Sequence, residues 1–252
     1  MKTAIIIPAR YASKRLPGKP LLRHTGKYLI QHVYEQACRS RRAYEVIIAT
    51  DDPRIVAAVH SFGGEVVLTQ RQHASGTDRV AEVAKTLDAD VIINLQGDEP
   101  LIEPEALDHL AHILENDPNA DMATLAVPLR SQEQYLNPNC VKVVCDRRGR
   151  AMYFSRSPIP YVRDGDPEFS TDPAYFLQHL GIYAYRRPVL LRLAASPPEP
   201  FEKLESLEQL RALAMGYRLH VGIVQQTAIG VDTREDYERF VDTYRQALVT
   251  AA

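Results

Sequence analysis

The chain has 252 residues, of which 45% are hydrophobic, and a formal net charge of −2 at neutral pH. A chain of this length can bury a sizeable core, which fits one large α/β domain or a main domain with an insertion. The small, mixed charge argues against a bulk electrostatic grip on nucleic acid, which needs a strongly basic domain or stripe. Any anion binding must therefore be local.

The first residues run directly into a short apolar segment, too brief for the core of a signal peptide or for a membrane span. We therefore expect a soluble, cytoplasmic protein that does not associate with membranes. The three cysteines, Cys38, Cys140 and Cys145, form no CxxC pair. This odd count argues against a disulfide framework or a structural zinc site.

The first half of the chain alternates apolar runs with amphipathic segments. The pattern predicts strands over 3–7, 45–50, 65–68 and 91–95, and helices over 29–38, 53–62, 76–87 and 104–115. Asp52 and Pro53 are typical of a helix N-cap followed by the first helical position. Such repeated βα units favour a parallel sheet covered on both faces, with ligands bound beyond the carboxyl ends of the strands.

The second half is richer in strands and turns. Strands are predicted over 122–128, 141–145, 151–154, 180–186 and 218–224, and helices over 206–215 and 233–248. The second of these helices has Asp232 as its expected N-cap, and the first should end at Gly216. The segment 158–173 contains four prolines and is predicted to be a loop.

The first candidate site is the loop that follows the first strand. Four basic residues lie within ten positions there: Arg10, Lys14, Arg15 and Lys19. The sequence has no GxxxxGK[ST] motif, so a triphosphate would be held by side-chain charge, for which arginine forks and lysine ammonium groups are suited. We expect this loop to be exposed, and a solvated basic loop without a ligand is the alternative.

Two further candidates follow later strands. Asp98 stands in the turn Asn94–Pro100 and would suit Mg²⁺ held by one or two carboxylates and phosphate oxygens, although a turn aspartate that bonds its own backbone is the alternative. Small polar residues at 73–79 lead into a helix and could allow close contact with a flat base or an anion. Simple capping by Ser75 or Thr77 explains the same residues.

A fourth set lies in the second half. Arg156 at a strand end could receive a carboxylate, and the Gln178–His179 pair could bond sugar hydroxyls. His179 could equally be a structural residue, and Glu208 a helix-surface acid. The residues alone thus predict an α/β enzyme with a basic phosphate loop and a metal-binding acid, without naming a substrate.

Together, seven segments resemble the signature of the 3-deoxy-manno-octulosonate cytidylyltransferase (CMP-KDO synthetase) family, in the same order and over nearly the whole chain. They are 7–21, 49–52, 75–79, 96–100, 153–160, 178–183 and 207–211. Residues 26–30 and 73–74 depart from the family pattern in ways that should affect packing only. The acidic, proline-rich content of 163–175 leaves open which octulosonate is used.

The resemblance implies a nucleotide-diphospho-sugar transferase fold, a Rossmann-like three-layer α/β/α arrangement with a mostly parallel sheet. It implies one domain over 1–252, with a strand-rich insertion at about 130–200 that serves sugar binding and dimerisation. It also implies transfer of CMP from CTP to the anomeric hydroxyl of 3-deoxy-D-manno-octulosonate (KDO) for lipopolysaccharide synthesis, dependence on Mg²⁺, and a homodimer. CMP activation of 8-amino-KDO or a sialate-like acid remains an alternative, as does a non-catalytic nucleotide-binding module.

The resemblance also implies roles for individual residues. The catalytic residues would be Lys19, Asp98 and Arg10, and the metal ligands would be Asp98 and Asp232. The nucleotide would be bound by Pro8, Ala9, Arg10, Arg15, Lys19, Ser75, Gly76, Thr77, Asp78, Arg79 and Gln96. The sugar acid would be bound by Arg156, Gln178, His179, Tyr185 and Glu208.

Overall fold

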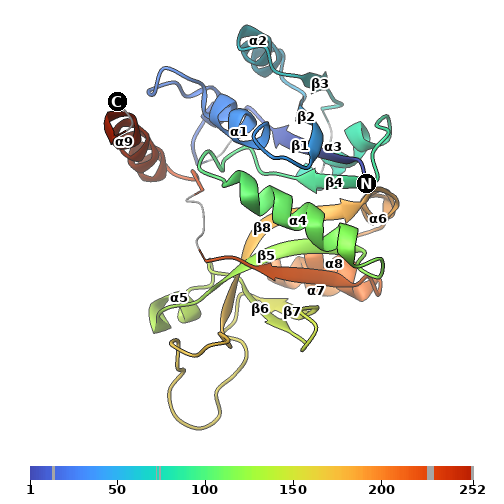
Figure 1. Ribbon diagram of the computed structural model, residues 1–252, viewed down its shortest axis with the longest axis vertical. Coiled ribbons are helices and arrows are strands. Elements are labelled where there is room, and N and C mark those ends of the chain that lie inside the picture. The colour runs from blue at the N-terminus through green and yellow to red at the C-terminus, as the bar shows by residue number, and fades with distance from the viewer. Residues whose placement is uncertain (13–14, 72, 74, 226–229, 251–252) are drawn as a thin grey trace. The chain divides into compact units, whose positions relative to one another are not determined.

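The computed structural model describes residues 1–12, 15–71, 73, 75–225 and 230–250 (Figure 1). The chain divides into two compact units: unit 1 is Met1–Asp108 with Ala228–Ala252, and unit 2 is His109–Thr227. No helix in the described ranges combines the length and the apolar character that a membrane span requires.

Unit 1 is built on a parallel sheet in the order β3-β2-β1-β4. The strands are β1 (Thr3–Ala9), β2 (Ala43–Thr50), β3 (Val66–Leu68) and β4 (Val91–Asn94). Every described pair in this order is parallel. All residues of β1 and β4 are buried, as expected for a sheet covered on both faces. The predicted parallel α/β sheet is confirmed.

The helices of unit 1 lie close to where the sequence predicts them. They are α1 (Leu29–Ala37), α2 (Pro53–Ser61), α3 (Gly76–Ala84) and α9 (Arg234–Thr250), with a short 3₁₀ helix, η1 (Lys19–Leu21). The next helix, α4 (Pro104–Asn116), begins in unit 1 and ends in unit 2. The predicted N-cap of α2 is confirmed, since the Asp52 side chain accepts from the Arg54 backbone N–H at 2.9 Å.

An apolar cluster brings the C-terminal helix against the loop that follows β1. Tyr237, Phe240 and Val241 of α9 pack with Leu16 and with Leu29 of α1, and Figure 1 shows α9 beside α1. The cluster also holds Val231. As a result, the chain immediately before α9 lies next to the loop that carries the predicted phosphate-binding residues.

The N-cap predicted for α9 is wrong by one residue. Thr233 Oγ1 accepts from the Asp236 backbone N–H at 3.2 Å, and the Asp236 carboxylate accepts from the Thr233 backbone N–H at 2.9 Å. These reciprocal bonds form a capping box around Thr233. The Asp232 carboxylate is instead engaged by Arg15 and Lys19.

Unit 2 has a mixed sheet. Its strands are β5 (Met122–Pro128), β6 (Lys142–Cys145), β7 (Ala151–Ser155), β8 (Leu177–Arg186) and β9 (Leu219–Ile223). Strand β5 pairs antiparallel with β8 and parallel with β9, while β6 pairs antiparallel with both β7 and β8. This part of the chain is therefore the strand-rich part that the sequence predicts.

The helices of unit 2 are short, and the sequence predicts them less well. They are α5 (Gln132–Leu136), α6 (Arg187–Ala195), α7 (Pro200–Glu205) and α8 (Gln209–Ala214). The predicted helix over 206–215 begins too early, because Ser206 has a left-handed backbone with φ of 52° and separates α7 from α8. Helices α5, α6 and α7 are not predicted.

Candidate functional site

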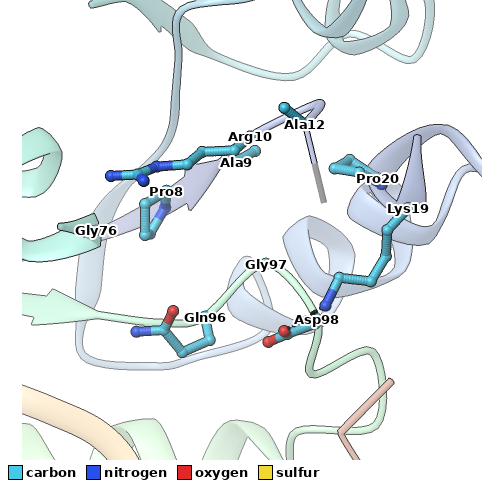
Figure 2. A pocket seen from close by; sticks show the side chains of 10 residues that line it. All are labelled: Pro8, Ala9, Arg10, Ala12, Lys19, Pro20, Gly76, Gln96, Gly97 and Asp98. Carbon is cyan, nitrogen blue, oxygen red and sulfur yellow. Dashed lines mark hydrogen bonds and ion pairs between the residues drawn. The ribbon is translucent and has the colours of Figure 1, made fainter. Parts of the chain in front are cut away.

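A pocket of about 300 Å³ opens in unit 1 where β1 and β4 end (Figure 2). This is the edge at which parallel α/β sheets bind ligands. Its lining residues come from the end of β1 and the loop after it, the start of α3 and the turn after β4: Pro8, Ala9, Arg10, Ala12, Lys19, Pro20, Gly76, Gln96, Gly97 and Asp98. The pocket therefore joins three of the four candidate segments.

Lys19 is the electrostatic centre of this pocket. Its Nζ lies 2.6 Å from Oδ2 of Asp98 and 3.4 Å from Oδ1 of Asp232, and it donates to the carbonyl oxygen of Val231 at 2.9 Å. Figure 2 shows the lysine side chain reaching down to Asp98. Its side chain is only 13% exposed, so the expectation of a fully exposed loop is wrong at this residue. Two carboxylates that are far apart in sequence thus converge on one cation.

The turn after β4 brings the chain very close to the end of β1. A Cβ atom at Gly97 would lie 3.0 Å from the carbonyl oxygen of Pro8 and 3.2 Å from Cδ1 of Ile30. Only glycine fits this approach without displacing its neighbours. Gly97 therefore sets the position of Asp98, although the sequence analysis did not include it among the site residues.

Glu99 adds a third carboxyl group to those of Asp98 and Asp232. Burial, together with the charges of Asp98 and Asp232, raises the pKa of Glu99 to about 7. The turn thus concentrates negative charge, which favours a bound cation. The sequence shows two adjacent acids, Asp98 and Glu99, in this turn. It does not show in which direction each side chain points.

The structure also tests whether Asp98 and Asp232 fit a metal ion. Within the described ranges, no group of three or more His, Cys, Asp and Glu side chains is arranged to hold one. Two converging carboxylates suit Mg²⁺, which is commonly held by one or two carboxylates together with substrate phosphates and water. The donor set is therefore compatible with Mg²⁺, and the metal-ligand roles stay predictions.

The two arginines of the first loop are placed differently. The Arg10 side chain lines the pocket, and one of its terminal nitrogens donates to the carbonyl oxygen of His73 at 3.0 Å. The terminal nitrogen of Arg15 lies 3.0 Å from Oδ1 of Asp232, and its side chain is 67% exposed. Lys14 lies outside the described residues. The loop thus supplies Arg10 and Lys19 to the pocket and Arg15 to Asp232.

Residues 75–79 serve mainly to build the start of α3. Ser75 and Asp78 form a capping box, with bonds of 3.1 and 2.9 Å. The hydroxyl of the buried Thr77 accepts from the Asn94 side chain at 3.4 Å. Of this segment, Gly76 lines the pocket. The capping explanation is confirmed for Ser75, and contact with the nucleotide stays a prediction for the segment.

Arg79 is a buried structural cation. Its side chain is 1% exposed, and a terminal nitrogen lies 2.9 Å from Oδ1 of Asp51, while another donates to the hydroxyl of Thr69. These bonds tie α3 to the ends of β2 and β3. Gln96 does line the pocket, where its amide nitrogen lies 3.5 Å from Oδ1 of Asn94.

The residues predicted to bind the sugar acid all belong to unit 2. Strand β8 supplies Gln178, His179 and Tyr185, β7 is followed directly by Arg156, and Glu208 precedes α8. Gln178 is half-buried and faces Val127 and Lys142 in the sheet register.

His179 is held as a neutral, buried side chain. Its Nε2 lies 3.0 Å from the hydroxyl of Thr124, and its ring packs against Phe154 and Tyr183 with centroid distances of 4.9 and 5.4 Å. Burial lowers the pKa of His179 to about 3. Proton transfer by this imidazole near neutral pH is therefore disfavoured, and a hydrogen-bonding role is compatible with its state.

Aromatic residues extend this group along β8. The rings of Tyr183 and Tyr185 are 5.9 Å apart, and Tyr185 is 2% exposed. Burial raises the pKa of Tyr183 well above its usual value, and the charge of Glu208 contributes in the same direction. Glu208 therefore lies near Tyr183, a residue that the sequence analysis missed although it shares the strand with His179.

Arg156 bonds mainly to the backbone. Its guanidinium donates to the carbonyl oxygens of Glu205 at 2.7 Å, Pro138 at 3.0 Å and Ser206 at 3.4 Å. The Glu205 carboxylate accepts from the Arg156 backbone N–H at 2.9 Å. These bonds hold the end of β7 against the turn between α7 and α8. Binding of a carboxylate by Arg156 stays a prediction.

The comparisons with known proteins agree with one another and cover most or all of the chain. A family model described as Cytidylyltransferase matches residues 4–219. The chain is 50% identical to the 3-deoxy-manno-octulosonate cytidylyltransferase of Syntrophobacter fumaroxidans, over 100% of both chains. It is 48% identical to the protein of the same name from Syntrophotalea carbinolica, over 95% of this chain and 97% of that one. Among solved structures, CMP:2-keto-3-deoxy-manno-octonic acid synthetase complexed with CTP matches with a TM-score of 0.91 and 46% identity, covering 98% of this chain and 100% of that one.

Proposed function

We propose that this chain, which belongs to the cytidylyltransferase family, transfers CMP from CTP to the anomeric hydroxyl of KDO, giving CMP-KDO and pyrophosphate. The family resemblance found in the sequence is confirmed, and so is the fold class. The observation that carries the proposal is the meeting of Lys19 with Asp98 and Asp232 beside Arg10, in a pocket at the carboxyl edge of the sheet.

The charges of the pocket suit the reaction. The anomeric hydroxyl attacks the α-phosphorus, which gathers negative charge, and pyrophosphate leaves with more. Arg10, Arg15 and Lys19 supply positive charge to the phosphates and thereby stabilise the transition state electrostatically. The same cations keep two anionic substrates together, which otherwise repel each other.

We propose Mg²⁺ as the cofactor, held by Asp98 and Asp232. When bound there with phosphate oxygens, the ion would offset the charge that develops on the α-phosphate and the leaving pyrophosphate. Lys19 would then release Asp98 in part and turn its ammonium group to the triphosphate, since its Nζ already lies in the pocket.

We assign cytosine to the start of α3 and Gln96, and the sugar acid to Arg156, Gln178, His179, Tyr185 and Glu208. Gly76 and Gln96 support the first assignment because they line the pocket. The neutral His179 and the nearby Tyr183 support the second, because a buried imidazole and phenol can bond hydroxyl groups without adding charge.

We also propose a homodimer that acts in the cytoplasm, where CTP is made. Large apolar side chains on β7 and α7 support the dimer: Met152 is 64% exposed, Phe201 58% and Leu204 81%. Exposed large apolar side chains favour association when they form a contiguous patch. Analytical ultracentrifugation of the parent and of Leu204→Glu tests this, and a parent that sediments as a monomer would refute it.

The experiment that tests the function is an assay of pyrophosphate release with purified protein. KDO, 8-amino-KDO and a sialic acid are each offered with CTP or UTP, with Mg²⁺ or with EDTA. We expect turnover with CTP, KDO and Mg²⁺, and a strong preference over UTP, because a site made for the amino group of cytosine leaves acceptors facing each other when uracil is bound. Turnover only with 8-amino-KDO or a sialic acid would change the assigned substrate, and no turnover with any acid would refute the proposal.

A further inference from the structure

The guanidinium of Arg10 is bonded to a carbonyl group from a distant segment of the chain. Its terminal nitrogen donates to the backbone oxygen of His73 at 3.0 Å, across 63 positions of the chain. A free arginine side chain samples many rotamers, and holding it in one costs conformational entropy. The bond to the His73 carbonyl therefore helps to hold Arg10 in one orientation in the pocket.

His73 is in turn held by an acid on α3. Its Nε2 lies 2.5 Å from Oε2 of Glu82, in a contact where the two side chains are 12% and 30% exposed. A carboxylate only accepts hydrogen bonds, so the His73 Nε2 donates. The same carboxylate accepts from the backbone N–H of Gln70, which lies 3.2 Å from each of its oxygens. The Glu82 carboxylate thus bonds both the ring of His73 and the backbone N–H of Gln70.

A second anchor lies one turn earlier on the same helix. The buried Arg79 bonds Thr69 and Asp51, so α3 holds the chain at Thr69 and again at Gln70 and His73. The pKa of Arg79 is lowered, mainly by burial. The charge of Asp51 raises it, that of Arg10 lowers it, and that of Glu82 raises it. The charges of Arg10 and Arg79 therefore repel each other, and the bond from Arg10 to the His73 carbonyl opposes this repulsion.

We propose that Glu82 is a positioning residue for the nucleotide site: it fixes His73, and the carbonyl of His73 orients Arg10 toward the triphosphate. The inference rests on the proposed function, in which Arg10 contacts the phosphates. Glu82 itself is not among the described residues that line the pocket, and its carboxylate is bonded to His73 and Gln70.

A double-mutant cycle tests this inference. Four proteins are compared: the parent, Glu82→Gln, Arg10→Ala and the combined variant. Glutamine keeps an acceptor for Gln70 but loses the charge that holds His73. We expect Glu82→Gln to lower kcat/KM for CTP roughly tenfold, the size of one lost charge-assisted bond, with an unchanged KM for the sugar acid. In the Arg10→Ala background, the same change should lower kcat/KM for CTP less than twofold.

The controls separate positioning from stability. Glu105→Gln removes an exposed acid from α4 and should leave both KM values unchanged. Thermal denaturation shows whether each variant is folded at the assay temperature. A Glu82→Gln effect that persists in full without Arg10, or that raises both KM values equally, would overturn the inference. If Arg10→Ala alone leaves kcat/KM for CTP unchanged, the phosphate role of Arg10 fails as well, so the two failures are distinguishable.

Discussion

The ammonium nitrogen of Lys19 lies 2.6 Å from Oδ2 of Asp98, with the lysine side chain 13% exposed and the aspartate 30%. A pair at this depth is screened less by water than a surface pair. Removing the lysine leaves Asp98 and Asp232 facing each other without their shared cation. Lys19 therefore stabilises the same two carboxylates that are proposed to bind the metal ion.

We expect Lys19→Met to lower the free energy of unfolding by about 1–2 kcal/mol in EDTA and to raise the KM for CTP. Added Mg²⁺ should restore much of the lost stability, because it supplies charge to the same carboxylates. Urea denaturation with and without Mg²⁺, together with CTP kinetics, measures both effects.

Lys27 offers a matched control, because its Nζ also lies 2.6 Å from a carboxylate, that of Glu35, but its side chain is 40% exposed. Lys27→Met should cost less stability and leave the KM for CTP unchanged. Parental CTP kinetics in Lys19→Met would reject its role at the triphosphate.

Asp98→Asn should fold like the parent and lose turnover by at least about a hundredfold, the scale of removing a key electrostatic group from a transition state. The carboxamide keeps the shape and one acceptor for Lys19 but holds Mg²⁺ weakly. Steady-state kinetics over a range of Mg²⁺ concentrations measure the change. Asp88→Asn is the control, since that side chain is 92% exposed. Near-parental turnover of Asp98→Asn at low Mg²⁺ would rule out the metal assignment.

Asp232 and Thr233 allow catalysis to be separated from helix capping. Thr233 caps α9, whereas the Asp232 carboxylate faces Arg15 and Lys19. Asp232→Asn should therefore reduce turnover with little change in stability. Thr233→Ala should lower the free energy of unfolding by about 1 kcal/mol and keep turnover per folded molecule. The opposite pattern, with stability lost in the first variant and activity in the second, would reject both roles.

The sequence was sufficient for the parallel half of the fold. The segments 3–7 and 91–95 consist mostly of apolar residues, and that local signal predicts buried strands. The predicted helix boundaries were less accurate where local sequence preferences and tertiary packing favour different conformations. Ser206 has no sequence signal for a left-handed backbone, yet its positive φ divides the segment 206–215 and leaves α8 to begin only at Gln209.

For the site, the sequence identified the segments that carry the functional residues, but not the hydrogen bonds and ion pairs that these residues form. The loop after β1 and the turn at Asp98 stood out because charged residues follow buried strands. The partners of those residues lie far away in the chain: Asp232 is 213 positions from Lys19, and the carbonyls bonded to Arg156 belong to residues 18 to 50 positions away. Such contacts depend on tertiary packing, which a single sequence does not encode in any local pattern.

His32 provides a prediction for the pH dependence of stability. This buried side chain packs against Phe240 and Tyr244, and its Nε2 lies 2.7 Å from the hydroxyl of Thr25. Burial lowers the pKa of His32 to about 4, below the value of about 6.5 expected in the unfolded chain. Between these values the unfolded state binds more protons, so stability is complete above about pH 6.5 and is lost as the pH falls.

We expect this histidine alone to cost about 1–2 kcal/mol between pH 7 and pH 5. His32→Gln keeps a partner for Thr25 but cannot be protonated, so its free energy of unfolding should fall less steeply over that range, although its stability at pH 7 is lower. The exposed His60 is the control, and His60→Gln should show the parental slope. Urea denaturation at pH 5, 6 and 7 gives the three slopes. A His32→Gln slope equal to that of the parent would mean that His32 is not the group whose protonation destabilises the fold.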